Sequence, residues 1–132
     1  MTPIKIPIDS HRFETLEIKI LDLPEALSIV QRLNGNFIQG IYAHCEDENE
    51  SYINILGGLD GRYVCTRNTL REGSLFVYCP GCSEMSSHDE PVSNFDSDWY
   101  PPEVIVDAQT CAEVLCEFVR QGRMPQGFNW HP

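Results

Sequence analysis

The stretch EVIVDAQTCAEVLCEFVRQGRMPQGFNW, residues 103–130, decides the fold because a strand, a helix, a helix stop and a terminal aromatic residue follow one another in it. The run 104–106 is valine and isoleucine behind two prolines, which predicts a strand buried on at least one face. Asp107 is placed to cap a helix. One apolar stripe at the helical period then predicts the buried side of that helix: Cys111, Val114, Leu115, Phe118 and Val119.

The end of the same stretch carries signals that stop a helix and close a core. Gly122 stands where a left-handed C-terminal cap is expected, and Pro125 prevents the helix from resuming. Trp130 is large enough to close one end of a core. We therefore predict that Trp130 is largely buried against the sheet together with Phe118 and Leu115.

Outward from this stretch, toward the N-terminus, the hydrophobic period changes from segment to segment. Residues 15–21 alternate apolar and charged side chains, which predicts a half-buried strand. Residues 23–33 repeat apolar side chains on one side, which predicts a helix ended by Asn34-Gly35. Residues 37–43 predict a strand in which Gly40 would allow a bulge.

Three more strands are predicted at residues 52–56, 63–66 and 75–78. The first two form a hairpin whose glycines supply positive φ, Gly57 and Gly58 among them. The predicted fold class is therefore α+β, with an antiparallel meander of about five to six strands packed against two helices. It comprises one domain over residues 1–132.

Two segments fall outside this periodic pattern. Residues 1–14 are expected to be an extended N-terminal segment. Residues 83–102 lack periodicity and gather serine, aspartate and glutamate, so we expect a long acidic surface excursion there.

The charge balance limits the partners. Nine lysines and arginines stand against twenty aspartates and glutamates, a formal net charge of −11, which repels nucleic acid and anionic lipid. A basic protein is the natural complement, and the simpler alternative is that acidity only keeps the protein soluble. The sequence shows neither a signal peptide nor a run of about 18 apolar residues, so we expect a cytoplasmic protein with reduced thiols and no membrane association.

Cys79-Pro80-Gly81-Cys82 is the clearest chemical motif. Its spacing suits a zinc site or a redox dithiol, but a structural zinc needs two more ligands and the chain has no second pair at that spacing. No helical stripe follows Cys82 as a thioredoxin-type motif requires. We favour a turn with two ordinary thiols over the metal and redox alternatives, and expect no cofactor.

The remaining polar residues do not form a catalytic pattern. The four histidines are scattered, and none stands in a recognisable nucleophile motif. The glycines of the predicted hairpin are not a phosphate loop, because no lysine follows them and a strand comes next. We therefore expect that the protein is not an enzyme.

The hairpin sequence YINILGG, residues 52–58, the following GRYV, residues 61–64, and the ending over residues 112–130 resemble immunity protein family 1 of bacterial polymorphic toxin systems. Members of that family look similar because they carry, in this order, a strand, a helix that ends in a Phe-Val-x-x-Gly-x-x-Pro-like pattern, and a tryptophan a few residues later. The matching residues here are Phe118, Val119, Gly122, Pro125 and Trp130. The chain departs from the family pattern at residues 79–102, which are longer and more acidic.

The resemblance implies a toxin inhibitor used in bacterial competition, which binds a cognate secreted toxin inside the producing cell. In that family the toxin is often a nucleic-acid deaminase or a nuclease. An acidic surface would complement the cationic cleft of such an enzyme. Two other functions stay open: a small metal- or thiol-binding protein that uses Cys79 and Cys82, and an acidic adaptor for another basic protein.

The two densest acidic runs are the predicted contact surface for the partner, because each is flanked by aromatic residues able to anchor a contact. Tyr42 and Tyr52 flank the first run. The predicted contact residues are Glu46, Asp47, Glu48 and Glu50 in the first run, and Asp89, Glu90, Asp96, Asp98, Trp99 and Tyr100 in and beside the second.

Overall fold

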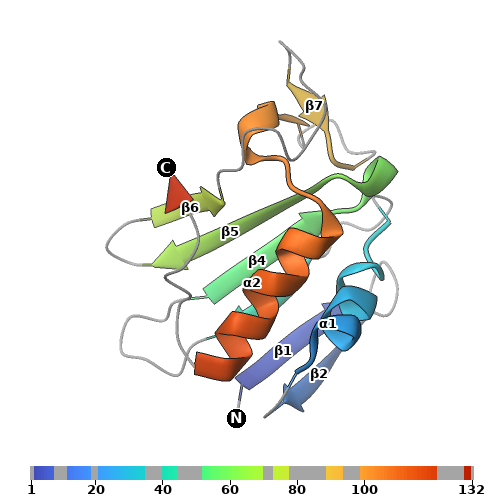
Figure 1. Cartoon of the computed structure of the whole chain (residues 1–132), viewed down its shortest axis with the longest axis vertical. Helices are drawn as coiled ribbons and strands as arrows, with labels where there is room; N and C mark the ends of the chain where they lie inside the picture. Colours follow the sequence, from blue (N-terminus) through green and yellow to red (C-terminus); the bar gives the residue numbers. More distant parts are fainter. Residues whose placement is uncertain are drawn as a thin grey trace.

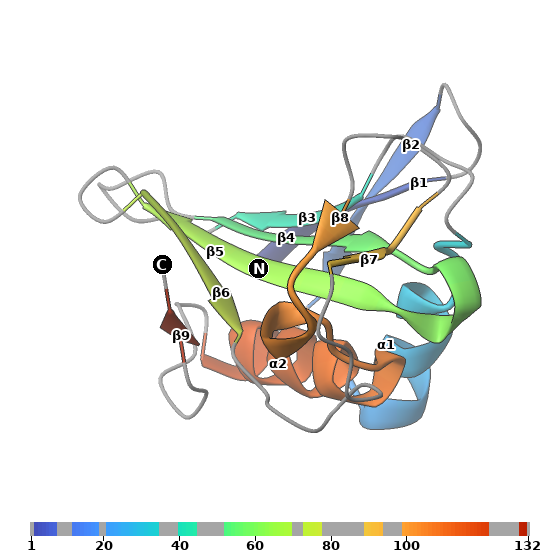
Figure 2. The same cartoon turned by 90° about the horizontal axis from the view of Figure 1, so that it is seen from above.

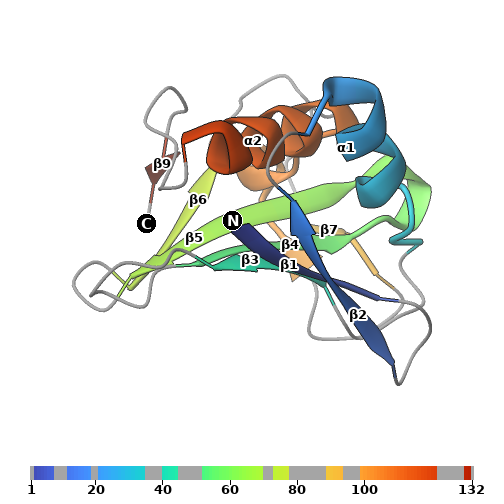
Figure 3. The ribbon, with the colours of Figure 1, turned by 90° about the horizontal axis from the view of Figure 1, so that it is seen from below.

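Among the described residues, two α-helices lie side by side on one face of an antiparallel sheet and none lies on the opposite face (Figure 1, Figure 3). The arrangement comes from a computed structural model. It describes residues 2–7, 12–18, 21–34, 40–44, 52–69, 73–77, 89–93, 99–121 and 130–131. The α+β fold class predicted from the sequence is confirmed.

In the part of the chain that the structure describes, the main sheet has seven strands in the order β2-β1-β3-β4-β5-β6-β9, and every neighbouring pair is antiparallel. Strands β3 to β6 form the predicted meander. The bounds are β1 Thr2–Pro7, β2 Phe13–Ile18, β3 Ile41–His44, β4 Tyr52–Gly57, β5 Tyr63–Thr69, β6 Gly73–Val77 and β9 Trp130–His131.

Each helix begins at an aspartate that accepts a hydrogen bond from a backbone N–H of the first turn. Helix α1, Leu23–Val30, is capped by the Asp22 carboxylate, which accepts from Glu25 at 2.8 Å. Helix α2, Ala108–Gln121, starts behind Asp107, whose carboxylate accepts from Thr110 at 2.8 Å. The predicted cap at Asp107 is therefore confirmed.

The main core lies between the helices and the sheet. All five residues of the predicted stripe on α2 are buried, including Phe118 and Leu115, which are fully buried. Alternate residues of the central strands meet them, as the two-residue period of a strand requires. On the sheet side these are Ile41, Ala43, Ile53, Ile55, Tyr63, Cys65 and Val77.

The turn between β4 and β5 is a short 3₁₀ segment, η1 Leu59–Gly61, and both glycines before it are structurally required. Gly57 and Gly58 have φ of 110° and 105°. A Cβ at Gly58 would lie 2.2 Å from the carbonyl oxygen of Leu33, behind α1. The predicted structural roles of Gly57 and Gly58 are confirmed.

Gly40 serves a close approach rather than a bulge. It directly precedes β3, which pairs with β4 in unbroken register. A Cβ there would lie 2.5 Å from the carbonyl oxygen of Ile55, so only glycine lets the two strands approach.

Within the segment expected to be extended, residues 1–14, the structure has strand β1, which lies inside the sheet between β2 and β3. Its prolines are tolerated because β3 pairs only with Ile4 and Lys5, so Pro3 and Pro7 lie outside the part of β1 that has a partner on both sides.

The prediction of a strand at residues 104–106 was wrong. Residues Pro102–Val104 form a 3₁₀ turn, η2, which bends the chain, and only Val106 reaches a strand. Val106 and Tyr63 exchange two backbone hydrogen bonds of 2.8 and 2.9 Å as an isolated bridge. The alternation of a strand nevertheless persists, since Ile105 and Val106 belong to different apolar clusters.

The C-terminus contributes a strand that the sequence did not predict. Trp130 pairs with Val77, so β9 joins the sheet beside β6. The predicted burial of the Trp130 side chain, and the predicted roles of Gly122 and Pro125, lie outside the described residues. Neither helix in the described ranges has both the length and the apolar character that a membrane crossing needs.

Candidate functional site

A small two-stranded ribbon lies on the side of the sheet away from the helices (Figure 2). It pairs β7, Glu90–Pro91, with β8, Trp99–Tyr100. The described part of the predicted acidic excursion is therefore not a surface loop alone, because Val92 is fully buried and Ser93 nearly so. Residues 83–88 and 94–98 lie outside the described residues.

A second apolar cluster fastens this ribbon to the sheet. Val64, Val92 and Ile105 are buried together, and the half-buried Leu56, Phe76 and Tyr100 pack against them. Val64 alternates along β5 with Tyr63 and Cys65, which face the helices, so the cluster lies on the opposite face.

Tyr100 faces the sheet and Trp99 is exposed. The rings of Tyr100 and Phe76 lie 5.9 Å apart at 57°, a favourable tilted arrangement. Trp99 is 52% exposed, and it is the exposed large apolar side chain of the described chain. Neighbouring residues of a strand point to opposite sides, so packing of Tyr100 directs Trp99 outward.

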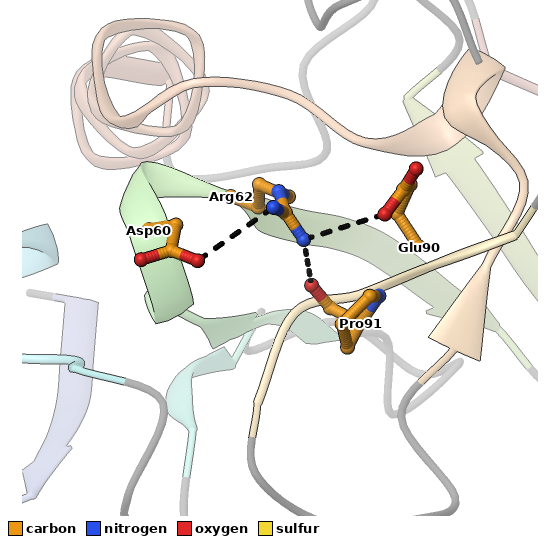
Figure 4. A network of polar contacts seen from close by, with 4 residues as sticks. All are labelled: Asp60, Arg62, Glu90 and Pro91. Carbon is orange, nitrogen blue, oxygen red and sulfur yellow. Dashed lines mark hydrogen bonds and ion pairs between the residues drawn. The ribbon is translucent and has the colours of Figure 1, made fainter.

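Arg62 ties the ribbon to the turn between β4 and β5 (Figure 4). Its guanidinium donates to the carbonyl oxygen of Pro91 at 2.9 Å and lies 3.6 Å from Asp60 and 3.7 Å from Glu90. In addition, the Leu59 N–H donates to the Val92 carbonyl at 3.0 Å. The turn and the ribbon therefore form one hydrogen-bonded unit.

Negative charge dominates around this unit. Three carboxylates, those of Asp60, Asp89 and Glu90, stand on it beside the single guanidinium of Arg62. Asp60 and Asp89 are exposed, and Glu90 is about one-third exposed. Ion pairs in such exposed positions contribute little to stability, so the excess charge remains available to a partner.

The other end of the helix-free face carries aromatic rings. Tyr42 and His44 on β3 alternate with the buried Ile41 and Ala43, which places them on this face. Tyr52 of β4 stands opposite His44 in the register, with the rings 5.5 Å apart, and the Tyr42 and Tyr52 rings are 6.4 Å apart.

Of the predicted contact residues, the structure describes Asp89, Glu90, Trp99 and Tyr100, and it brings them together in and beside the β7–β8 ribbon. Tyr100 is half-buried against Phe76, so it supports the site rather than offering an exposed anchor. The others, Glu46, Asp47, Glu48, Glu50, Asp96 and Asp98, lie outside the described residues.

Sequence reasoning missed Arg62 and Val92. Arg62 follows a glycine turn, and nothing in the local pattern indicates that it reaches a residue about thirty positions away. Val92 is an isolated apolar residue in a polar stretch, which gives no period to read.

The metal and thiol alternatives concern Cys79 and Cys82, whereas the described ranges contain three other cysteines. No group of three or more His, Cys, Asp or Glu side chains in them could hold a metal ion. The described cysteines Cys65, Cys111 and Cys116 are not in disulfide bonds. Burial raises the pKa of Cys111 well above its ordinary value, and a hydrogen bond with Cys65 adds to this, so that thiol stays neutral. Cys79 and Cys82 lie outside the described residues.

Comparison with known proteins gives no relative: no family model matches the sequence, and no curated protein or solved structure is significantly similar to the chain.

Proposed function

We propose that this chain is a non-enzymatic immunity protein, which binds a toxin with a basic surface and neutralises it in the cytoplasm of the bacterium that makes both. The observation that carries the proposal is the exposed Trp99 on the ribbon fastened beside Asp60, Asp89 and Glu90. The family resemblance in the sequence motivates the choice of a toxin as the partner.

The exposure of Trp99 argues for a contact rather than a solvated loop. A tryptophan gains free energy when it leaves water, and tryptophan is enriched among residues that dominate binding energy. Its neighbour Tyr100 is anchored on Phe76 and β8 pairs with β7, so the backbone at Trp99 is already ordered and only side-chain rotamer freedom is lost when Trp99 is buried.

The surrounding carboxylates supply a different part of the interaction. Exposed charges add little to the energy of a complex, but they speed encounter with a partner of opposite charge. A nuclease or a nucleic-acid deaminase needs a cationic surface for its own substrate. An acidic inhibitor with a net charge of −11 therefore suits that class of toxin.

The test is co-purification with the product of the adjacent gene, followed by a growth-protection assay with that product as the toxin. We expect Trp99→Ala to weaken binding about 30-fold or more, mainly through faster dissociation, because an anchor that becomes buried is lost. Its melting temperature should stay close to that of the wild type, since the ring is half exposed.

A matched pair of charge reversals tests the acidic surface. Asp89→Lys lies beside the ribbon and Glu113→Lys lies on α2, and both side chains are exposed. We expect Asp89→Lys to slow association about tenfold at low salt and Glu113→Lys to have little effect. Wild-type protection by both Trp99→Ala and Asp89→Lys would contradict this site, and failure of the wild type to bind the adjacent product would contradict the function.

A further inference from the structure

We propose that the partner's footprint extends from the β7–β8 ribbon across the helix-free face of the sheet, and that the partner places a basic segment on that face. The inference rests on the proposed function and deepens it. The uncovered part of the face is formed by Tyr42, His44, Tyr52, Asn68 and Ser74, and Thr66 on the same face is buried.

Register places these side chains in rows across four strands. His44, Tyr52, Asn68 and Ser74 follow one another from β3 to β6, and Thr66 stands in the adjoining row beside Phe76. Both helices lie on the other side of the sheet, and the ribbon covers only the end near Leu56, Val64 and Phe76 (Figure 2). The rest of this face lacks a covering element among the described residues.

The composition of the face resembles the centre of a protein interface. Among the described residues of β3 to β6, the side chains on this face include no carboxylate, ammonium or guanidinium. The centre of a protein interface is depleted of charge and enriched in tyrosine, while its rim is polar. An ordinary solvated sheet face shows polar residues alone, whereas this one places two tyrosines and a histidine together.

The polar groups of the face are already ordered. The Ser74 hydroxyl donates to the Asn68 side-chain oxygen at 2.5 Å, and the Asn68 amide donates to the Thr66 hydroxyl at 3.1 Å. The Thr66 hydroxyl in turn donates to the backbone oxygen of Asn54 at 3.5 Å. Groups held in this way lose little rotamer freedom when a partner docks.

Size links the face to the ribbon. Four strands span about 14 Å and the length of β4 from Tyr52 to Leu56 about 13 Å, at ordinary strand spacings. The resulting area of roughly 200 Å² is about a quarter of what one partner buries in a typical stable complex. A stable partner must therefore also contact a neighbouring surface, and the ribbon with Trp99 continues the same side of the molecule (Figure 2).

The negative charge beside this face favours a basic segment of the partner. The protein is strongly acidic, and the ribbon at one end of the face carries Asp89 and Glu90. Arginine and lysine side chains are attracted to such negatively charged surroundings, and they interact favourably with the faces of tyrosine rings. A segment rich in these residues fits better than a neutral or acidic one.

The experiment introduces a positive and, separately, a negative charge at the same neutral position. Ser74 is exposed on this face and Ser28 is exposed on α1, so both can be changed to Lys and to Glu without burying a charge. We expect Ser74→Lys to raise the Kd for the adjacent gene product about tenfold or more, because it repels a basic segment. Ser74→Glu loses the same hydroxyl and should bind at least as tightly as the wild type. Both Ser28 variants should bind like the wild type.

His44→Lys repeats the test at the other edge of the face, in case Ser74→Lys fails to fold. Circular dichroism and thermal melts establish folding for every variant. Weakening by the lysine variants at Ser74 or His44, but not at Ser28, supports the inference. Wild-type affinity of folded Ser74→Lys and His44→Lys, alongside a defect in Trp99→Ala, would overturn the inference and leave the proposed function standing. Absence of any complex with the wild type would overturn both.

Discussion

The two faces of the sheet use the same strands for different purposes. The helix-covered face is mostly apolar, with Arg67 of β5 on the same side, and its apolar residues pack into one continuous core with α1 and α2. The helix-free face has a small apolar cluster at one end, where Val92 and Ile105 meet Val64, and polar and aromatic side chains elsewhere. Stability therefore depends mainly on the first face, and the second face is the one for which we propose binding.

The comparison can be tested most strongly at the centre of the helix-covered face. Phe118 is fully buried in the main core, so Phe118→Ala should lower the free energy of unfolding by about 3–5 kcal/mol. Urea unfolding measures the change. Gln109→Ala, exposed on the same helix, is the matched control and should alter stability by less than about 0.5 kcal/mol. A small effect of Phe118→Ala would mean that the helices are not the main source of stability.

A smaller effect is expected in the cluster on the other face. Val92→Ala should cost about 1–3 kcal/mol, because a fully buried side chain loses two methyl groups and leaves a cavity. Its effect should be local. Hydrogen exchange should become faster at the Leu59 amide, which donates to the Val92 carbonyl, while the amides of α2 keep their protection. A cost equal to that of Phe118→Ala would remove the distinction between the two faces.

The pH dependence of stability separates the faces in a further way, because the buried thiol of Cys111 belongs to the helix-covered face. Its pKa is raised in the folded protein, so the unfolded chain releases the proton at a lower pH than the folded chain does. The contribution of this thiol to the pH dependence of stability is therefore absent below about pH 8.5, and above that pH it lowers stability by at most about 1.4 kcal/mol per pH unit.

Urea unfolding between pH 7.5 and 9.5 checks this expectation. Cys111→Ala removes the titrating group and should show a shallower decline than the wild type, whatever its constant loss of packing. Val92→Ala should decline in parallel with the wild type, since its cluster contains no thiol. Equal slopes for the wild type and Cys111→Ala would show that the thiol does not differ between the folded and unfolded states.

Much of the candidate site could not be predicted from the sequence, and what was missed are contacts between residues far apart in the chain. The sequence predicted Trp99 beside an acidic segment as a contact residue, because charge and side-chain type are local properties, and in the structure the Trp99 side chain is exposed. The sequence did not indicate that Tyr100 would turn inward, or that Arg62 would hold Pro91. Those contacts join residues far apart in the chain, and no periodic pattern encodes them.

The sequence by itself determined the elements whose burial follows a regular period. The stripe on α2, the cap at Asp107 and the positive φ of the glycines before η1 depend on periodicity, hydrogen bonds and turn geometry within a few residues. A period states which side of an element is buried, but not which surface buries it. Only the tertiary structure decided that β1 enters the sheet beside β3, that β9 pairs with β6, and that Val92 and Ile105 cover the second face. These outcomes depend on backbone pairing and packing between distant segments, whose free energy exists only once the chain has brought them together.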